Sequence, residues 1–157
     1  MRLMPKNTTW TDNWNNVIRN VIFPDPILRE LMLLPKNVTI TQFIDKYFIE
    51  DEGGGEILTD EPVRICWYDT QGNDTGNMNV RMKYKEFDIY VKRERLHDAT
   101  MDRLQNRYNL IAQRLKELLQ GDEVEGLHFE YEDEFNLYTK TPGYKRYHLD
   151  LYYFTSI

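Results

Sequence analysis

Residues 144–153 read Tyr-Lys-Arg-Tyr-His-Leu-Asp-Leu-Tyr-Tyr, and this stretch decides the fold class. Its apolar side chains occupy every second position, at Tyr147, Leu149, Leu151 and Tyr153. The alternate positions hold His148, Asp150 and Tyr152. A period of two is typical of a β-strand that buries one face and leaves the other polar. We therefore expect a final strand packed on a core through its odd-numbered residues.

The same alternation precedes this strand in residues 127–137. Apolar side chains take the odd positions Leu127, Phe129, Tyr131, Phe135 and Leu137. The even positions hold His128, Glu130, Glu132 and Glu134. The pattern predicts a strand or hairpin arm with one buried side, and Thr141-Pro142-Gly143 predicts the turn into the final strand.

Further strands are indicated between residues 62 and 92, and the core from 62 to 157 is expected to run β-β-β-α-β-β. Val63, Ile65 and Trp67 alternate with polar neighbours, and a connection rich in glycine and asparagine follows at residues 71–77. The next apolar face consists of Val80, Met82 and Tyr84, and it continues with opposite parity in Phe87, Ile89 and Val91. A β-bulge or turn near Lys85 would explain the change of parity.

One long helix is expected after the third of these strands. Its apolar residues step by three and four, at Met101, Leu104, Tyr108, Ile111, Leu115 and Leu118. Asp98 or Thr100 is expected to cap it, and Gly121 to end it. Residues 62–157 thus predict an α+β core domain, in which an antiparallel sheet carries one long packed helix.

The first 50 residues predict a helical N-terminal segment. Asp25 before Pro26 is a good N-cap, and Thr39-x-x-Gln42 has the form of a capping box. Residues 51–61 then form an acidic, glycine-rich stretch that predicts a flexible loop and the segment boundary. Its glycines Gly53, Gly54 and Gly55 are not a phosphate-binding loop, because no Gly-Lys-Ser/Thr follows.

Composition limits the classes of function. A length of 157 residues suits one compact domain, and a net charge of −6 disfavours a module that grips nucleic acid through phosphates. The single cysteine, Cys66, permits no intrachain disulfide and is expected to be a small apolar strand residue. We expect no membrane span and no secretory leader, which fits folding in a cytoplasm.

Candidate sites for catalysis or metal binding have simpler explanations. The run of Glu130, Glu132 and Glu134 is expected to be a solvated charged face rather than a cation site. Asp88 and Lys92 have the wrong spacing for a nuclease motif. His97, His128 and His148 are expected at the surface or an interface, since two histidines on neighbouring strands are a weak zinc signal. We therefore expect no catalytic residue, metal or cofactor.

A stripe of arginines on the predicted long helix has two interpretations. Arg103, Arg107 and Arg114 fall within about 40° of one another at 100° per residue. They form either an ordinary solvent face or a contact face for an acidic surface. In the second case Glu130, Glu132 and Glu134 of another copy would be the partner. Such a heterologous contact closes into a ring when the rotation permits.

Three stretches resemble the phage tail-completion and head–tail joining proteins. They are residues 86–92 (Glu-Phe-Asp-Ile-Tyr-Val-Lys), residues 102–116 on the predicted helix, and residues 139–153 with their Gly143-Tyr144-x-Arg146 start. Residues 23–32 (Phe-Pro-Asp-Pro-Ile-Leu-Arg-Glu-Leu-Met) also resemble an N-terminal segment of neck proteins from phages of Gram-positive hosts. The resemblance covers about two thirds of the chain, and its motifs describe a fold pattern without a catalytic signature.

The resemblance implies a virion protein of the phage neck, assembled in the host cytoplasm and not an enzyme. It implies a ring, commonly of six subunits with twelve as the alternative, between the portal connector and the tail tube. Six copies at −6 each would carry −36, which repels DNA passing through the lumen. Residues Gly53, Gly54 and Gly55 would contact the adjoining ring. The alternatives are a phage-encoded protein-binding or assembly-chaperone module and, third, a metal-dependent nuclease.

Overall fold

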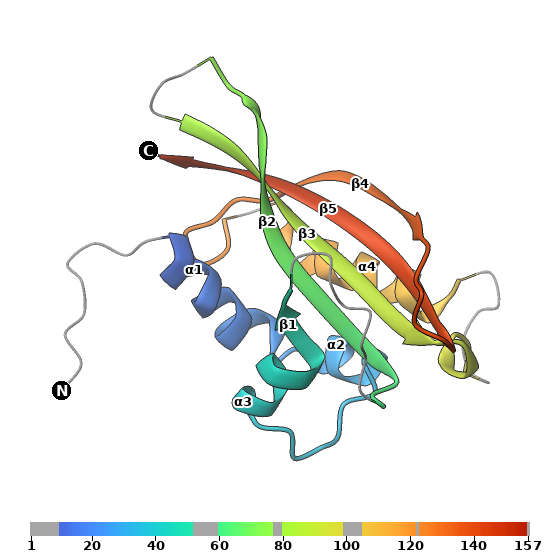
Figure 1. Cartoon of the computed structure of the whole chain (residues 1–157). Coiled ribbons are helices and arrows are strands. Elements are labelled where there is room, and N and C mark those ends of the chain that lie inside the picture. Colours follow the sequence, from blue (N-terminus) through green and yellow to red (C-terminus); the bar gives the residue numbers. More distant parts are fainter. Residues whose placement is uncertain (1–9, 52–59, 77–79, 99–104, 122, 157) are drawn as a thin grey trace.

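The structure is a computed structural model that describes residues 10–51, 60–76, 80–98, 105–121 and 123–156 (Figure 1). Within these residues one sheet has the strand order β1-β2-β3-β5-β4. Its strands are β1 (Phe48–Glu50), β2 (Val63–Asp74), β3 (Val80–Lys92), β4 (Glu130–Leu137) and β5 (Tyr144–Ser156). β1 joins β2 in parallel and the other neighbours are antiparallel, so the sheet is mixed. The predicted α+β class is confirmed.

Several helices, rather than one long helix, cover a single face of this sheet (Figure 1). They are α1 (Trp10–Val17) with η1 (Ile18–Ile22), α2 (Pro26–Leu31), α3 (Ile40–Gln42) with η2 (Phe43–Tyr47), η3 (Arg93–Arg95) and α4 (Arg107–Leu119). Among the described residues of the region expected to form the long helix, the 13 residues of α4 are helical. No helix of the described residues combines the length and the apolar character that crossing a bilayer requires.

Aromatic packing joins the N-terminal helices to the sheet. Trp14 of α1 is buried and lies edge-on against Trp67 of β2 and Phe129, with ring centroids 5.4 and 5.8 Å apart. Phe48 of β1 packs at 6.3 Å from Phe87 of β3. The segment before residue 50 and the region after residue 62 therefore share one hydrophobic core.

Helix starts follow the local sequence signals at two of three places. Asp25 caps α2 through a 2.8 Å bond from the Leu28 N–H, and Thr39 and Gln42 form the predicted capping box of α3. The start of α4 was predicted wrongly at Asp98 or Thr100, because Asn106 is the capping residue. Residues 99–104, which include Thr100, Met101 and Leu104, lie outside the described residues.

β3 contains no bulge at Lys85, contrary to the expectation. It pairs with β5 in unbroken register from Val80 opposite Ser156 to Lys92 opposite Tyr144. The odd-numbered residues from Lys85 to Val91 are buried against the helices, and Lys85 itself is fully buried. The apparent change of parity arises because Met82 and Tyr84 lie on the other face, so residues 80–92 form one strand where the pattern indicated two.

A bulge lies in β4, and β2 has a further register shift between Gln71 and Asp74. The register between β4 and β5 shifts between Tyr131 and Asp133, so that Tyr131 pairs with Leu151 and Glu134 pairs with Leu149. Leu149 and Leu151 both face the helices, and therefore Tyr131 and Glu134 do as well. This corrects the expectation that Glu130, Glu132 and Glu134 share one face.

The far ends of β2, β3 and β5 extend beyond the helices as a three-stranded ribbon (Figure 1). We call this ribbon, residues 70–76, 80–84 and 152–156, the arm. On the side of the sheet away from the helices, β3 and β5 bring Met82 opposite Phe154 and Tyr84 opposite Tyr152. The arm thus carries an aromatic face of its own.

Candidate functional site on the open face of the sheet

The candidate site lies on the face of the sheet opposite the helices, which we call the open face. It consists of two cross-strand pairs of β3 and β5. Asp88 is in register with His148, and Glu86 is in register with Asp150. Since side chains on one face recur at every second residue, these pairs are adjacent on the same surface.

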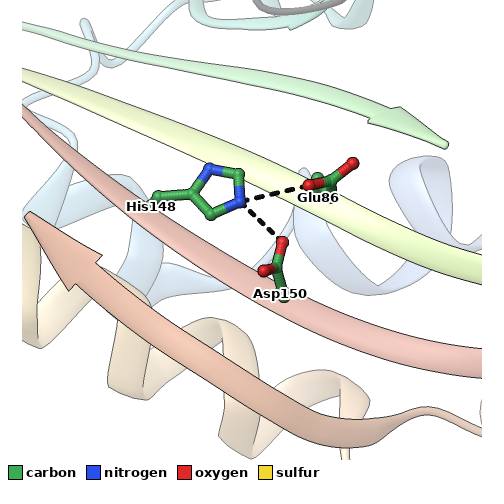
Figure 2. Close-up of side chains that lie close together, drawn as sticks. All are labelled: Glu86, His148 and Asp150. Atoms are coloured by element: carbon green, nitrogen blue, oxygen red, sulfur yellow. Dashed lines mark hydrogen bonds and ion pairs between the residues drawn. The ribbon is translucent and has the colours of Figure 1, made fainter. Parts of the chain in front are cut away.

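His148 is at the centre of the site. Its imidazole is buried, and its Nδ1 lies 2.8 Å from Oδ1 of Asp88. Its Nε2 lies 2.6 Å from Oδ1 of Asp150 and 3.3 Å from Oε1 of Glu86 (Figure 2). One imidazole therefore meets three carboxylates, one through Nδ1 and two through Nε2.

The charge of His148 is set by these neighbours. Burial opposes a charged imidazole, but the hydrogen bonds to Asp150, Asp88 and Glu86 outweigh it and raise the pKa of His148 to about 11. Burial also raises the pKa of the Asp150 carboxyl group, although His148 acts in the opposite direction. The site thus concentrates more negative charge than one imidazolium balances.

Asp88 is held from a second side by Arg146. The guanidinium Nε donates a 3.0 Å hydrogen bond to Oδ1 of Asp88, and the guanidinium also lies over the Tyr90 ring. Asp88 is fully buried, yet its pKa is lowered, because bonds from His148 and Arg146 outweigh the cost of burial. Its other oxygen, Oδ2, has no hydrogen-bond partner among the described residues.

Solvent reaches two of the carboxylates of the site but not its imidazole. The ring of Phe135 on β4 lies 5.1 Å from the imidazole of His148 and covers it. The side chains of Glu86 and Asp150 each remain 17% exposed, so solvent reaches their carboxylates. The arrangement suits two kinds of chemistry: a buried ion network, or a cation held by imidazole nitrogen and carboxylate oxygen.

Sequence reasoning did not find this site. His148 was expected at a surface or interface, but only 3% of the residue is exposed. His128, which precedes β4 in the sequence, pairs instead with Glu130 at 2.6 Å. Parity places Asp88 and His148 on polar faces, but their adjacency depends on the register between strands that are 60 residues apart.

The predicted arginine contact face is not formed as expected. Arg107 is buried, and it donates hydrogen bonds to the backbone oxygens of Arg95 and Leu31 and to Asp98. Arg114 binds Asp25 within the same chain. Arg103 lies outside the described residues. Both described arginines are therefore occupied in joining elements of one subunit.

The three glutamates of the predicted acidic face also lie in different surroundings. Glu134 faces the helices, where it pairs with Lys116 of α4 and accepts a 2.8 Å bond from the Tyr147 hydroxyl. Glu132 stays exposed at the bulge, and Glu130 contacts His128. Gly53, Gly54 and Gly55, the predicted contact to an adjoining ring, lie outside the described residues.

Cys66 conforms to its expected role. It is buried on the open face beside Tyr90 and Tyr144. Burial raises the pKa of its thiol to about 11, which keeps it protonated and unreactive.

A second polar cluster, around Lys85, lies on the helix-facing side of the sheet. The Lys85 ammonium is 2.9 Å from Asp69 and lies over the rings of Trp14 and Trp67 at 4.0 and 4.6 Å. The Tyr153 hydroxyl donates a 3.0 Å bond to the same Asp69 carboxylate. Burial lowers the pKa of Lys85 to about 8, although Asp69 opposes this. The cluster is closed by aromatic rings, and we interpret it as a structural ion pair.

Comparison of the sequence with known families and curated proteins gives no match. The chain matches no protein-family model and no curated protein sequence. The proposed function therefore rests on the structure and sequence of the chain itself.

Proposed function

We propose that the chain is a structural subunit of a phage neck, and that it forms a ring between the head connector and the tail through which DNA passes. Six subunits are expected, with twelve as the alternative. In this role the subunit acts through its shape and surface chemistry and is not an enzyme. The α+β fold with its projecting arm and the sequence resemblance support the proposal.

The arm is the observation on which the proposal depends. Its aromatic face consists of Tyr84, Tyr152 and Phe154 with Met82 beside them, and Phe154 is 54% exposed. Tyr153 at the base of the ribbon belongs to the hydrophobic core, but no described element covers the opposite face, and contiguous apolar surface there favours association. A neighbouring copy that covers this face would complete the missing layer.

A ring requires two different surfaces on each subunit. The arm supplies one of them. The edge strand β4 supplies a candidate for the second, because Tyr131 and Phe135 are each 40% exposed there and β4 has β5 as its only neighbour in the described sheet. Unpaired edge strands readily accept another chain. We therefore expect the arm of one copy to contact the β4 region of the next.

Charge is consistent with a passage for DNA. The chain carries −6, and six copies would repel the phosphates of the duplex rather than bind them. The exposed acids of β4, Glu132 and Asp133, are candidates for the channel lining, whereas Glu134 is engaged with Lys116.

The assembly is tested by measuring the mass of the purified chain in solution by light scattering. We expect a closed oligomer, and we expect Phe154→Glu to dissociate it to monomers. Ile27→Glu is the matched control, since Ile27 on α2 is an apolar residue, 50% exposed, that lies outside both the arm and β4. A wild-type monomer at all concentrations, together with absence from virions, would exclude the ring.

The location is tested by mass spectrometry and antibody labelling of purified virions. A neck subunit stays in the finished particle and is seen at the junction of head and tail. An assembly chaperone, the alternative class, is found in infected cells but is missing from virions. The third class, a metal-dependent nuclease with Asp88 and Glu130 as its acidic residues, is not favoured by their placement, because the two lie opposite His148 and Tyr152, four positions apart along β5.

A further inference from the structure

We propose that Glu86, His148 and Asp150 form a binding site for a divalent transition cation, with Zn²⁺ or Mn²⁺ as the expected ion. The ligand atoms would be Nε2 of His148 and one carboxylate oxygen from each acid. Glu86 comes from β3, and His148 and Asp150 come from β5 (Figure 2). The site is independent of the proposed neck function.

The spacing of the three ligand atoms fits one ion. All of them lie within 4.8 Å of one another. Ligands about 2.0–2.2 Å from a single ion are separated by at most about 4.4 Å, so only a small movement of side chains is needed. Glu86 and Asp150 are in direct register on adjacent antiparallel strands, which fixes their separation through the backbone.

Asp88 orients the histidine as a metal-bound histidine requires. Histidine ligands generally donate their second ring N–H to a carboxylate, which fixes the tautomer and the ring plane. Here Nδ1 is 2.8 Å from the fully buried Asp88, and Arg146 holds Asp88 in place. Nε2 therefore points at the two remaining carboxylates, and a cation that binds there takes the place of the Nε2 proton.

Charge favours a cation at this position. Glu86, Asp88 and Asp150 face Arg146 and His148, so the group carries an excess of negative charge even when the imidazole is protonated. Oδ2 of the buried Asp88 accepts no hydrogen bond within the described residues, so only one oxygen of that carboxylate is bonded. A divalent ion would neutralise this excess more completely than one proton does.

The ligand set selects the type of ion. An imidazole nitrogen with two carboxylate oxygens suits Zn²⁺ or Mn²⁺, whereas Mg²⁺ and Ca²⁺ prefer all-oxygen sites with more ligands. The partial exposure of Glu86 and Asp150 leaves room for water at the positions that the protein does not fill. The bound ion would connect β3 and β5 next to the base of the arm.

The experiment uses the full chain after treatment with a chelator. Zn²⁺, Mn²⁺, Mg²⁺ and Ca²⁺ are titrated separately by calorimetry, and Co²⁺ is added as a spectroscopic probe whose visible bands report its ligands. We expect one Zn²⁺ or Mn²⁺ per chain. We expect Glu86→Gln and Asp150→Asn each to weaken binding at least tenfold, the range seen when metal-site residues are altered.

The matched control is the double variant His128→Gln/Glu130→Gln. This variant removes another histidine–carboxylate pair, 2.6 Å apart, at the start of β4. We expect the variant to bind the ion as the wild type does. Circular dichroism verifies that each variant is folded. The proposal is overturned if the wild type binds no transition cation, if Mg²⁺ binds equally well, or if the control variant loses binding while Asp150→Asn keeps it. None of these results depends on ring formation.

Discussion

Arg114 of α4 and Asp25, the N-cap of α2, form a two-point ion pair between residues 89 positions apart. Nε of Arg114 is 3.0 Å from Oδ2 of Asp25, and a terminal nitrogen is 2.6 Å from Oδ1. The same Asp25 carboxylate accepts the Leu28 N–H. The buried Asp25 side chain thus caps α2 and attaches α4 to it. Arg114 is therefore bound within its own chain.

Asp25→Asn is expected to lower the free energy of unfolding by about 2–3 kcal/mol at pH 7, the usual value for a charged hydrogen bond. The hydrogen bond from Arg114 lowers the pKa of Asp25 below its usual value of 3.8. A lowered pKa means that the stabilisation is complete above pH 4 and is lost as the pH falls through the folded-state pKa. Denaturant titrations between pH 2 and pH 7 should therefore show wild type and variant converging in acid.

Glu117→Gln is the control for that measurement. Glu117 is the second, exposed partner of Arg114, at 2.9 Å. Exposed pairs contribute at most about 1 kcal/mol, so this variant should stay close to the wild type at every pH. If the Asp25→Asn difference were independent of pH down to pH 2, the ion pair would not be its cause.

Lys85→Met is expected to cost about 3–5 kcal/mol, because it leaves the Asp69 charge without its buried partner. Methionine preserves most of the apolar stem between Trp14 and Trp67, so the loss reports the ammonium group. Adding Asp69→Asn to the same chain should recover part of the loss, and a double-mutant cycle by urea denaturation measures the coupling. Lys145→Met, at an exposed position of β5, is the neutral control. Strict additivity of the two changes would contradict the ion pair.

Arg107→Lys is expected to destabilise the fold by about 2–4 kcal/mol, although it keeps the charge. The guanidinium donates to two backbone oxygens, of Arg95 and Leu31, and to Asp98, and a lysine cannot reproduce this planar set of donors. The oxygens left without donors account for the cost. Thermal unfolding measures it, and light scattering below the transition should show the same oligomer as the wild type. A folded variant that fails to assemble would instead place Arg107 at a subunit contact.

Thr39→Ala is expected to cost about 1 kcal/mol, the typical value of an N-cap. The Thr39 hydroxyl accepts from the Gln42 N–H at 3.2 Å, and the Thr39 N–H donates to Oε1 of Gln42 at 2.9 Å. Thr41→Ala, two residues further along and exposed, is the control with an unchanged cap. Equal midpoints for both variants in chemical denaturation would show that the box contributes nothing.

Local signals in the sequence were sufficient where the structure depends on neighbouring residues. The Asp25 cap, the Thr39 box and the period of two at Tyr147–Tyr153 act over a few residues, so a single stretch of chain specifies them. The α+β class follows from the order of such stretches. The sequence placed Arg114 on one side of the predicted helix, but it did not indicate that Arg114 binds Asp25, 89 residues away.

The sequence by itself determined the α+β class, the odd-numbered core face of β5 and the acidic charge of the chain. Only the tertiary structure decided strand register, the bulge in β4 and the burial of charged groups such as Lys85 and His148. The physical reason is that register sets which side chains meet across a sheet, and it results from packing of the whole core rather than from any one strand. The Glu86–His148–Asp150 site consequently exists only in the folded chain.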